Sequence, residues 1–152
     1  MGPPRHLTLV TRTRPPYGAE QEVPVEVRDA MTEAVLTIGP AHTLRQAAQQ
    51  MATRKVGAAV VLDPEADGPG ILTERDVLEA VAAGQDVETE VCADHLTADA
   101  VTAEPGWDLD RAAAAMLTGG FRHLVVCEGG HVVGVLSVRD VVRVWGRQPA
   151  AR

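Results

Sequence analysis

The sequence predicts an α+β fold in which two β-α-β-β-α repeats pack sheet to sheet about a pseudo-twofold axis. The first observation is a stretch that occurs twice, GILTERDVL at residues 70–78 and GVLSVRDVV at residues 134–142. The second is that further matches keep one register, which is the mark of a duplicated unit. The third is that strands and helices alternate within each copy, so helices can cover one face of each sheet and leave the other face for the second copy.

The matching residues of the two copies lie in predicted strands, helices and turns alike. Before the repeated stretch the spacing between matching residues is 65, and within it the spacing is 64. The matching pairs include Thr37 and Thr102, Pro40 and Pro105, Met51 and Met116, Leu72 and Leu136, and Asp76 and Asp140.

The first copy begins with a short strand and a helix. Residues 35–38 are β-prone and are followed by a Gly-Pro pair that ends the strand. Thr43 is the expected N-cap of the helix, and Gln46 at the third helical position completes a capping box. The next apolar residues recur at helical spacing and predict one buried face: Leu44, Ala47, Ala48 and Met51.

The rest of the first copy predicts two strands and a second helix. Residues 57–62 are a continuous run of small apolar residues, which is typical of a strand buried on both faces. A turn-rich loop at 63–69 leads to a strand at residues 71 and 72. The last helix is expected to begin at Thr73 and to end at Gly84, a natural position for a left-handed glycine.

The second copy repeats this order of elements. Its predicted elements are a strand at 100–102, a helix capped by Asp108, a strand at 121–126, a tight turn at 128–130, a strand at 132–136 and a helix from Ser137 to about Trp145. The expected organisation is an extended N-terminal tail with one possible strand (1–26), a first repeat (27–84), a linker (85–90), a second repeat (91–147) and a C-terminal tail (148–152).

Composition limits the class of partner. The net charge of −7 argues against general binding to nucleic acid or an anionic membrane, which requires a basic face. No apolar run approaches the roughly 20 residues that span a bilayer, and the first residues lack a signal-peptide pattern. Cys92 and Cys127 fit small hydrophobic residues of a reducing compartment better than a disulfide framework. A cytoplasmic location is the expectation.

The combination of these motifs resembles a CBS-domain pair, also called a Bateman module. The resemblance lies first in the motif near the end of each copy, Gly-Ile-Leu-Thr-x-x-Asp in the first and Gly-Val-Leu-Ser-x-x-Asp in the second. It also lies in the Thr-x-x-Pro at residues 37–40 and 102–105 and in Phe-Arg-His-Leu at residues 121–124. It covers about residues 27–145. It implies a module that binds an adenosine-containing ligand in the seam between the two copies.

Thr73 and Asp76 support two interpretations. Taken alone they form a capping box at the start of a helix. The same geometry can also bind a nucleotide, because a helix N-terminus favours phosphate and a carboxylate accepts hydrogen bonds from a ribose diol. The resemblance favours the second interpretation, and Ser137 and Asp140 carry the same argument in the second copy.

Arg122 and His123 are the next candidates, since apolar neighbours suggest that they lie on a largely buried strand. A desolvated arginine would require an anion, and phosphate suits it well. In proteins that this chain resembles, each site takes its aspartate from one copy and its strands from the other. The resemblance therefore implies a first site of Thr73, Asp76, Thr102, Arg122, His123 and Leu124, and a second site of Thr37, Val56, Gly57, Ala58, Ser137 and Asp140.

The two implied sites are expected to differ. Gly57 and Ala58 stand where the second copy has Arg122 and His123, so the second site should be roomier and should lack a fixed phosphate ligand. We expect the site with Arg122 to bind an anionic nucleotide better, and the other site to hold a less charged adenosyl compound or nothing. Arg54 and Lys55 are interpreted as a solvated helix end.

The predicted function is a non-enzymatic regulatory module that signals to a separate partner protein. The sequence has no catalytic constellation, phosphate-binding glycine loop or metal-ligand spacing, so no catalytic residue, metal or required cofactor is expected. The ligand would be AMP, ADP or ATP, with S-adenosylmethionine or NAD as further options. One alternative is a CBS-pair interaction or stress-response protein that binds no nucleotide. Another is a dissociable regulatory subunit of an enzyme or transporter.

Proteins of this kind form homodimers through helices, which suggests a dimer interface here. The residues expected at that interface, or else in the monomer core, are Val77, Leu78, Val81, Val141, Val142 and Trp145.

Overall fold

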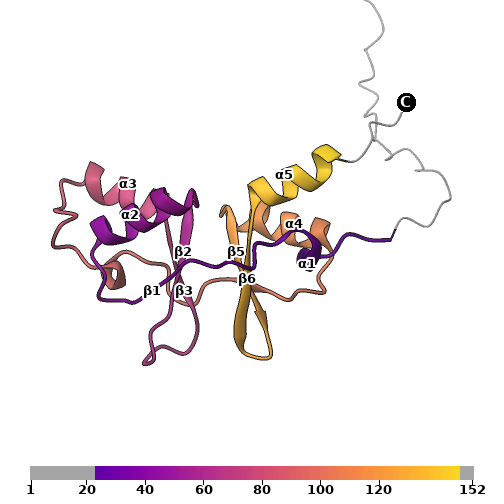
Figure 1. Ribbon diagram of the computed structural model, residues 1–152, viewed down its shortest axis with the longest axis horizontal. Helices are drawn as coiled ribbons and strands as arrows, with labels where there is room; N and C mark the ends of the chain where they lie inside the picture. Colours follow the sequence, from indigo (N-terminus) through magenta and orange to yellow (C-terminus); the bar gives the residue numbers. More distant parts are fainter. Residues whose placement is uncertain (1–22, 148–152) are drawn as a thin grey trace, which may run out of the picture.

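The computed structural model describes residues 23–147 and places them in two halves that lie side by side, each a three-stranded sheet with helices on one face (Figure 1). The strand expected in the N-terminal tail and the C-terminal tail at 148–152 lie outside the described residues. Among the residues described, no helix has the length and apolar character that crossing a bilayer requires.

The predicted β-α-β-β-α order is confirmed in both copies. The first copy contains β1 (Thr37–Ile38), α2 (Leu44–Arg54), β2 (Ala58–Val61), β3 (Gly70–Thr73) and α3 (Glu74–Ala82). The second contains β4 (Thr102–Ala103), α4 (Leu109–Gly119), β5 (His123–Glu128), β6 (His131–Ser137) and α5 (Val138–Arg147). Each copy begins with a short helix, α1 (Val27–Ala30) in the first and the 3₁₀ helix η1 (Cys92–Asp94) in the second.

The two sheets have the same topology. In each, the first strand runs parallel to the second and the second pairs antiparallel with the third. The register is also equivalent, because Thr37 lies opposite Val60 and Thr102 lies opposite Val125. Gly129 and Gly130, both with positive φ, form the predicted tight turn between β5 and β6.

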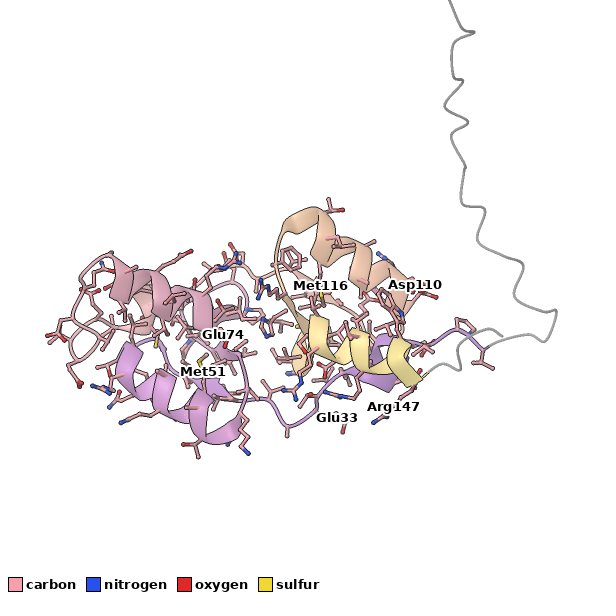
Figure 2. The ribbon with its side chains drawn as sticks, turned by 90° about the horizontal axis from the view of Figure 1, so that it is seen from above. Glu33, Met51, Glu74, Asp110, Met116 and Arg147 are labelled. Carbon is pink, nitrogen blue, oxygen red and sulfur yellow. The ribbon has the colours of Figure 1, made fainter. Side chains whose placement is uncertain are left out.

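Side chains alternate between the two faces of each sheet and so define the layers. On β2, Ala59 and Val61 pack with the helices of the first copy, whereas Ala58 and Val60 pack with residues of the other sheet. Val125 of β5 belongs to that shared cluster. The predicted sheet-to-sheet packing is therefore confirmed. Met51 of α2 and Met116 of α4, labelled in Figure 2, are buried at equivalent places in the two helical layers.

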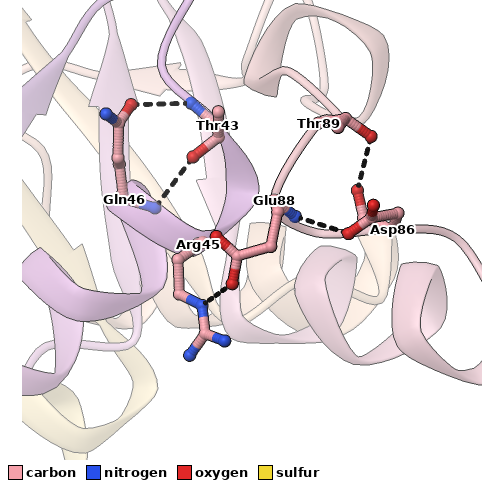
Figure 3. Close-up of polar contacts among 6 residues, drawn as sticks. All are labelled: Thr43, Arg45, Gln46, Asp86, Glu88 and Thr89. Atoms are coloured by element: carbon pink, nitrogen blue, oxygen red, sulfur yellow. Dashed lines mark hydrogen bonds and ion pairs between the residues drawn. The ribbon is translucent and has the colours of Figure 1, made fainter.

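The capping residues predicted for α2 and α4 are confirmed. The Thr43 backbone N–H donates to Gln46 Oε1 over 3.0 Å, and the Gln46 N–H donates to Thr43 Oγ1 over 3.1 Å (Figure 3). Asp108 caps α4 by accepting a hydrogen bond from the Asp110 N–H. Gly84 lies just beyond α3 with φ of +76°, as its predicted role at the helix end requires.

The linker between the copies folds back onto the start of α2 (Figure 3). Arg45 Nε lies 2.6 Å from Glu88 Oε1, and the Glu88 N–H donates to Asp86 Oδ1 over 3.0 Å. The backbone supports the same arrangement, because the Arg45 N–H donates to the Val87 carbonyl. The linker is thus part of the folded first half.

The first helix of each repeat packs into the core of the other repeat. Val27 of α1 is fully buried in the second copy's core, and Cys92 of η1 is fully buried in the first copy's core. The exchange is reciprocal in the backbone too: the Val27 N–H donates to the Trp107 carbonyl, and the Cys92 N–H donates to the His42 carbonyl. Both cysteines are free, and Cys92 fills the place of a small hydrophobic residue as expected.

Candidate functional site

Two cavities open at the seam between the repeats. The smaller, about 220 Å³, is lined by Thr73, Asp76 and other residues and is called the Asp76 pocket. The larger, about 770 Å³, is lined by Ser137, Asp140 and other residues and is called the Asp140 pocket. Glu74, Arg122 and His123 line both pockets, so they separate the two cavities. Glu74 is labelled in Figure 2.

The start of α3 positions the acid of the Asp76 pocket. Asp76 Oδ2 accepts hydrogen bonds from the Thr73 backbone N–H at 2.7 Å and from Thr73 Oγ1 at 3.1 Å. The capping interpretation is therefore confirmed. Asp76 Oδ1 accepts no hydrogen bond from any described residue, and the side chain is only half-buried. Capping thus occupies one carboxylate oxygen and leaves the other available to a ligand.

The second repeat supplies the opposite side of the Asp76 pocket. Arg122 and His123 line it together with apolar side chains. These apolar residues are Ile71, Ala100, Val101 and Phe121. An acid from one copy and a guanidinium from the other therefore share a single cavity, as the sequence predicted.

Two residues expected at this site lie elsewhere. Leu124 is fully buried in the second copy's core, because strand alternation directs it toward the helices while His123 faces the seam. Thr102 is exposed and borders a separate hollow beside the Gly129-Gly130 turn. The structure therefore brings together Thr73, Asp76, Arg122 and His123 but not these two.

The expectation of a desolvated Arg122 is wrong. β5 begins at His123, so Arg122 precedes the strand and its side chain is exposed. The Arg122 carbonyl accepts a hydrogen bond from the Val138 N–H, which fixes the backbone at the pocket mouth. An exposed arginine at this place still offers a charge-assisted hydrogen bond to an anion that enters either pocket.

The surroundings of His123 favour its neutral form. Burial lowers the pKa of its imidazole below the usual value because the charged form is poorly solvated there. The Glu74 and Asp140 carboxylates oppose this effect, and the Arg122 guanidinium adds to it. His123 is therefore a hydrogen-bonding group rather than a second cation.

The start of α5 positions the acid of the Asp140 pocket. Asp140 is 4% exposed, and its Oδ2 accepts hydrogen bonds of 2.9 Å from both the backbone N–H and Oγ of Ser137. Its Oδ1 accepts a hydrogen bond of 2.9 Å from Arg143 Nη2. Unlike Asp76, this aspartate has hydrogen-bond donors on both oxygens.

The remaining residues expected at the second site are mostly present. Val56, Gly57 and Ala58 line the Asp140 pocket opposite Ser137 and Asp140. Thr37 does not line it. It is exposed on the short edge strand β1, while its neighbour Leu36 borders the cavity.

The second site was expected to be roomier and to lack a fixed phosphate ligand; its cavity is the larger of the two, but it does contain basic side chains. Lys55, Arg139 and Arg143 line it along with Arg122. The sequence analysis took Lys55 for a solvated helix end and did not single out Arg139 or Arg143 for this pocket. Helical spacing could have identified Arg143, because a residue three positions after Asp140 lies on the same face of α5.

Among the described residues, no group of three or more His, Cys, Asp and Glu side chains is arranged to hold a metal ion. The two pockets themselves offer carboxylates, guanidinium groups and helix N-termini. These groups suit a ligand that combines hydroxyls with an anionic end.

Comparison with known proteins gives consistent matches over the described chain. The CBS domain family matches at residues 27–83 and again at 91–147. Protein MJ1225 of Methanocaldococcus jannaschii is 34% identical over 120 residues, which span 79% of this chain but only 42% of that protein. This chain therefore corresponds to less than half the length of MJ1225.

Solved structures agree with the sequence matches. The CBS-domain containing protein ATU1752 from Agrobacterium tumefaciens is 31% identical, with a TM-score of 0.73 over 80% of this chain and 99% of that one. The CBS domain protein PAE2072 from Pyrobaculum aerophilum, complexed with AMP, is 28% identical, with a TM-score of 0.70 over 76% of this chain and 89% of that one.

Proposed function

This chain belongs to the CBS-domain family, and on that premise we propose that it is a non-enzymatic regulatory module that binds an adenosine-containing ligand between its repeats and signals to a separate protein. The ligand is AMP, ADP or ATP, with S-adenosylmethionine and NAD as further candidates. The observation that carries the proposal is the shared cavity of Asp76 and Arg122, one from each repeat. The AMP complex of the similar protein PAE2072 supports it.

The Asp76 pocket offers a suitable partner for each part of an adenosine nucleotide. A ribose diol can donate to Asp76 Oδ1, the oxygen that no described residue contacts. The apolar side chains of Ile71, Ala100 and Val101 can cover the faces of the base. Arg122 can then bind the phosphate through a charge-assisted hydrogen bond.

Calorimetric titration of AMP into the wild type and Asp76→Ala tests this proposal. We expect saturable binding in the wild type, and affinity at the Asp76 pocket at least about tenfold weaker in the variant because a hydrogen bond to a charged group is lost. The matched control is Asp108→Ala, which also removes a helix cap but lines neither pocket. It should bind AMP as the wild type does.

Absence of binding would contradict the proposal. If AMP, ATP and S-adenosylmethionine all fail to bind the folded wild type, the chain is an interaction protein that uses the same fold without a nucleotide. Equal loss of affinity in Asp76→Ala and Asp108→Ala would show that helix capping, and not contact with the ligand, explains the effect.

We further propose that the chain forms a homodimer through α3 and α5. Leu78 and Val81 on α3 are 67% and 55% exposed, and Val142 and Trp145 on α5 are 56% and 46% exposed. Large apolar side chains exposed on a helix surface are a feature of interaction sites. Of the other expected interface residues, Val77 is half-buried against the first core and Val141 is buried in the second core.

The double variant Leu78→Glu with Val142→Glu tests the dimer by light scattering after gel filtration. We expect the wild type to have twice the mass of one chain and the variant to have the mass of one chain, because four buried carboxylates would oppose association. Leu117→Glu is the matched control, since Leu117 is 84% exposed on a different helix, α4. A wild type that is monomeric at high concentration would contradict the proposal.

A further inference from the structure

The two pocket aspartates differ in one hydrogen bond. Asp140 Oδ1 accepts from Arg143 over 2.9 Å, while no described residue donates to Asp76 Oδ1. The difference begins in the sequence, because the residue three positions after the aspartate is Glu79 in the first repeat and Arg143 in the second. Each lies on the same helical face as its aspartate.

The hydrogen bond from Arg143 opposes binding of an uncharged nucleoside. A ribose diol that approaches Asp140 must displace Arg143 from Oδ1, and the nucleoside offers the guanidinium no anion in return. Asp140 is nearly fully buried, so water compensates poorly for a lost partner. A phosphate chain, in contrast, offers Arg143 a new charged partner and leaves Asp140 to accept the diol.

The surroundings of Asp140 also favour a polyanion. Four basic side chains (Lys55, Arg122, Arg139 and Arg143) and two acidic ones (Glu74 and Asp140) line this pocket, whereas two of each line the Asp76 pocket. The Asp140 pocket is also the larger of the two, with a volume of about 770 Å³ against about 220 Å³ for the Asp76 pocket. A phosphate chain therefore has both space and counter-charge beside Asp140.

We propose that Arg143 sets the ligand class of the Asp140 pocket, so that this pocket takes an adenosine polyphosphate and rejects an uncharged adenosine compound. The Asp76 pocket, which has no such arginine, takes the ribose diol of either class. This inference rests on the proposed function, because it requires that the pockets bind adenosine compounds. It reverses the expectation from sequence that the Asp140 pocket is the less suited to charged ligands.

The test compares ATP and adenosine in the Asp76→Ala background, which leaves the Asp140 pocket as the site observed. We expect ATP to bind there more tightly than adenosine. Adding Arg143→Gln should weaken ATP about tenfold through loss of a charge-assisted hydrogen bond. The same change should strengthen adenosine binding several-fold, because a neutral amide holds Oδ1 of Asp140 less strongly than the guanidinium does.

Two further variants control for indirect effects. Arg143→Lys keeps the cation and should keep the preference for ATP. Glu79→Arg, made with Asp140→Ala so that only the Asp76 pocket is observed, should weaken adenosine binding there, because it places an arginine three residues after Asp76. Glu79 is exposed, so the substitution is compatible with the fold.

The inference is supported if Arg143→Gln weakens the affinity for ATP and strengthens the affinity for adenosine. Equal shifts, or none, would overturn it while leaving the proposed function intact, provided that ATP binds. Failure of both ligands to bind the wild type would overturn the inference and the proposed function together.

Discussion

Val27→Asp is expected to lower the free energy of unfolding by about 3–5 kcal/mol, which is the usual effect of an uncompensated charge in a core. Val27 is fully buried in the second copy's core, although in sequence it belongs to the first copy. Its backbone N–H donates to the Trp107 carbonyl over 2.8 Å, so the segment cannot turn outward without breaking that contact. Urea denaturation followed by circular dichroism measures the effect.

The control for this prediction is Val23→Asp. Val23 is 85% exposed in the same N-terminal stretch, and its substitution should change the stability by less than about 0.5 kcal/mol. If Val27→Asp prevents folding altogether, Val27→Ala replaces it, with an expected loss of about 2 kcal/mol from the two methyl groups and the cavity.

Double-mutant cycles identify the core to which Val27 belongs. The effects of Val27→Ala and Leu109→Ala on the free energy of unfolding should be non-additive, because both residues belong to the second core. The effects of Val27→Ala and Leu44→Ala should add, because Leu44 belongs to the first core and coupling requires shared neighbours. The reverse pattern, with coupling to Leu44, would contradict the exchanged arrangement.

Arg122→Ala is expected to weaken nucleotide binding at both pockets, by about 10- to 100-fold at each, because a charged hydrogen-bond donor to phosphate is lost. Arg122 is one of three residues that line both cavities, and it is the one that carries a permanent positive charge, whereas burial lowers the pKa of His123. Each of the other pocket arginines lines one cavity: Arg75 lines the Asp76 pocket, and Arg139 and Arg143 line the Asp140 pocket.

The measurement is a titration of ATP into Arg122→Ala in two backgrounds, Asp76→Ala and Asp140→Ala, each of which leaves one pocket to be observed. Arg45→Ala is the matched control, because Arg45 is a surface arginine paired with Glu88 and lines neither pocket. If Arg122→Ala keeps the wild-type affinity for ATP at one pocket, Arg122 does not contact phosphate at that pocket, and the prediction for both pockets is wrong.

Local sequence patterns predicted most of the fold. The register of the repeat implied two copies of one topology, and the capping residues Thr43 and Asp108 located two helix starts. Alternation in a wholly apolar run could not show which side chains face which layer, because Ala58 and Ala59 look alike until the partner sheet is known. The exchange of α1 and η1 was also missed, because Val27 and Cys92 belong in sequence to one copy but are buried in the core of the other.

The candidate site was predicted in part. Asp76 and Arg122 were expected to meet across the seam, and both line one cavity. Leu124 and Thr102 were assigned to it from resemblance alone, and neither lines it, since Leu124 faces the helical layer and Thr102 lies on an edge strand. The role proposed for Arg143 depends on its ion pair with Asp140, which was seen only in the structure.

The reciprocal exchange of α1 and η1 has a consequence for the origin of this chain. Each copy completes the core of the other, so a single copy made as an independent polypeptide would expose the apolar surface that its partner's leading segment covers. An ancestral gene that encoded one copy would therefore have required two identical chains that traded these segments, as in domain-swapped dimers. Gene fusion would then have converted an association that depends on concentration into a permanent one.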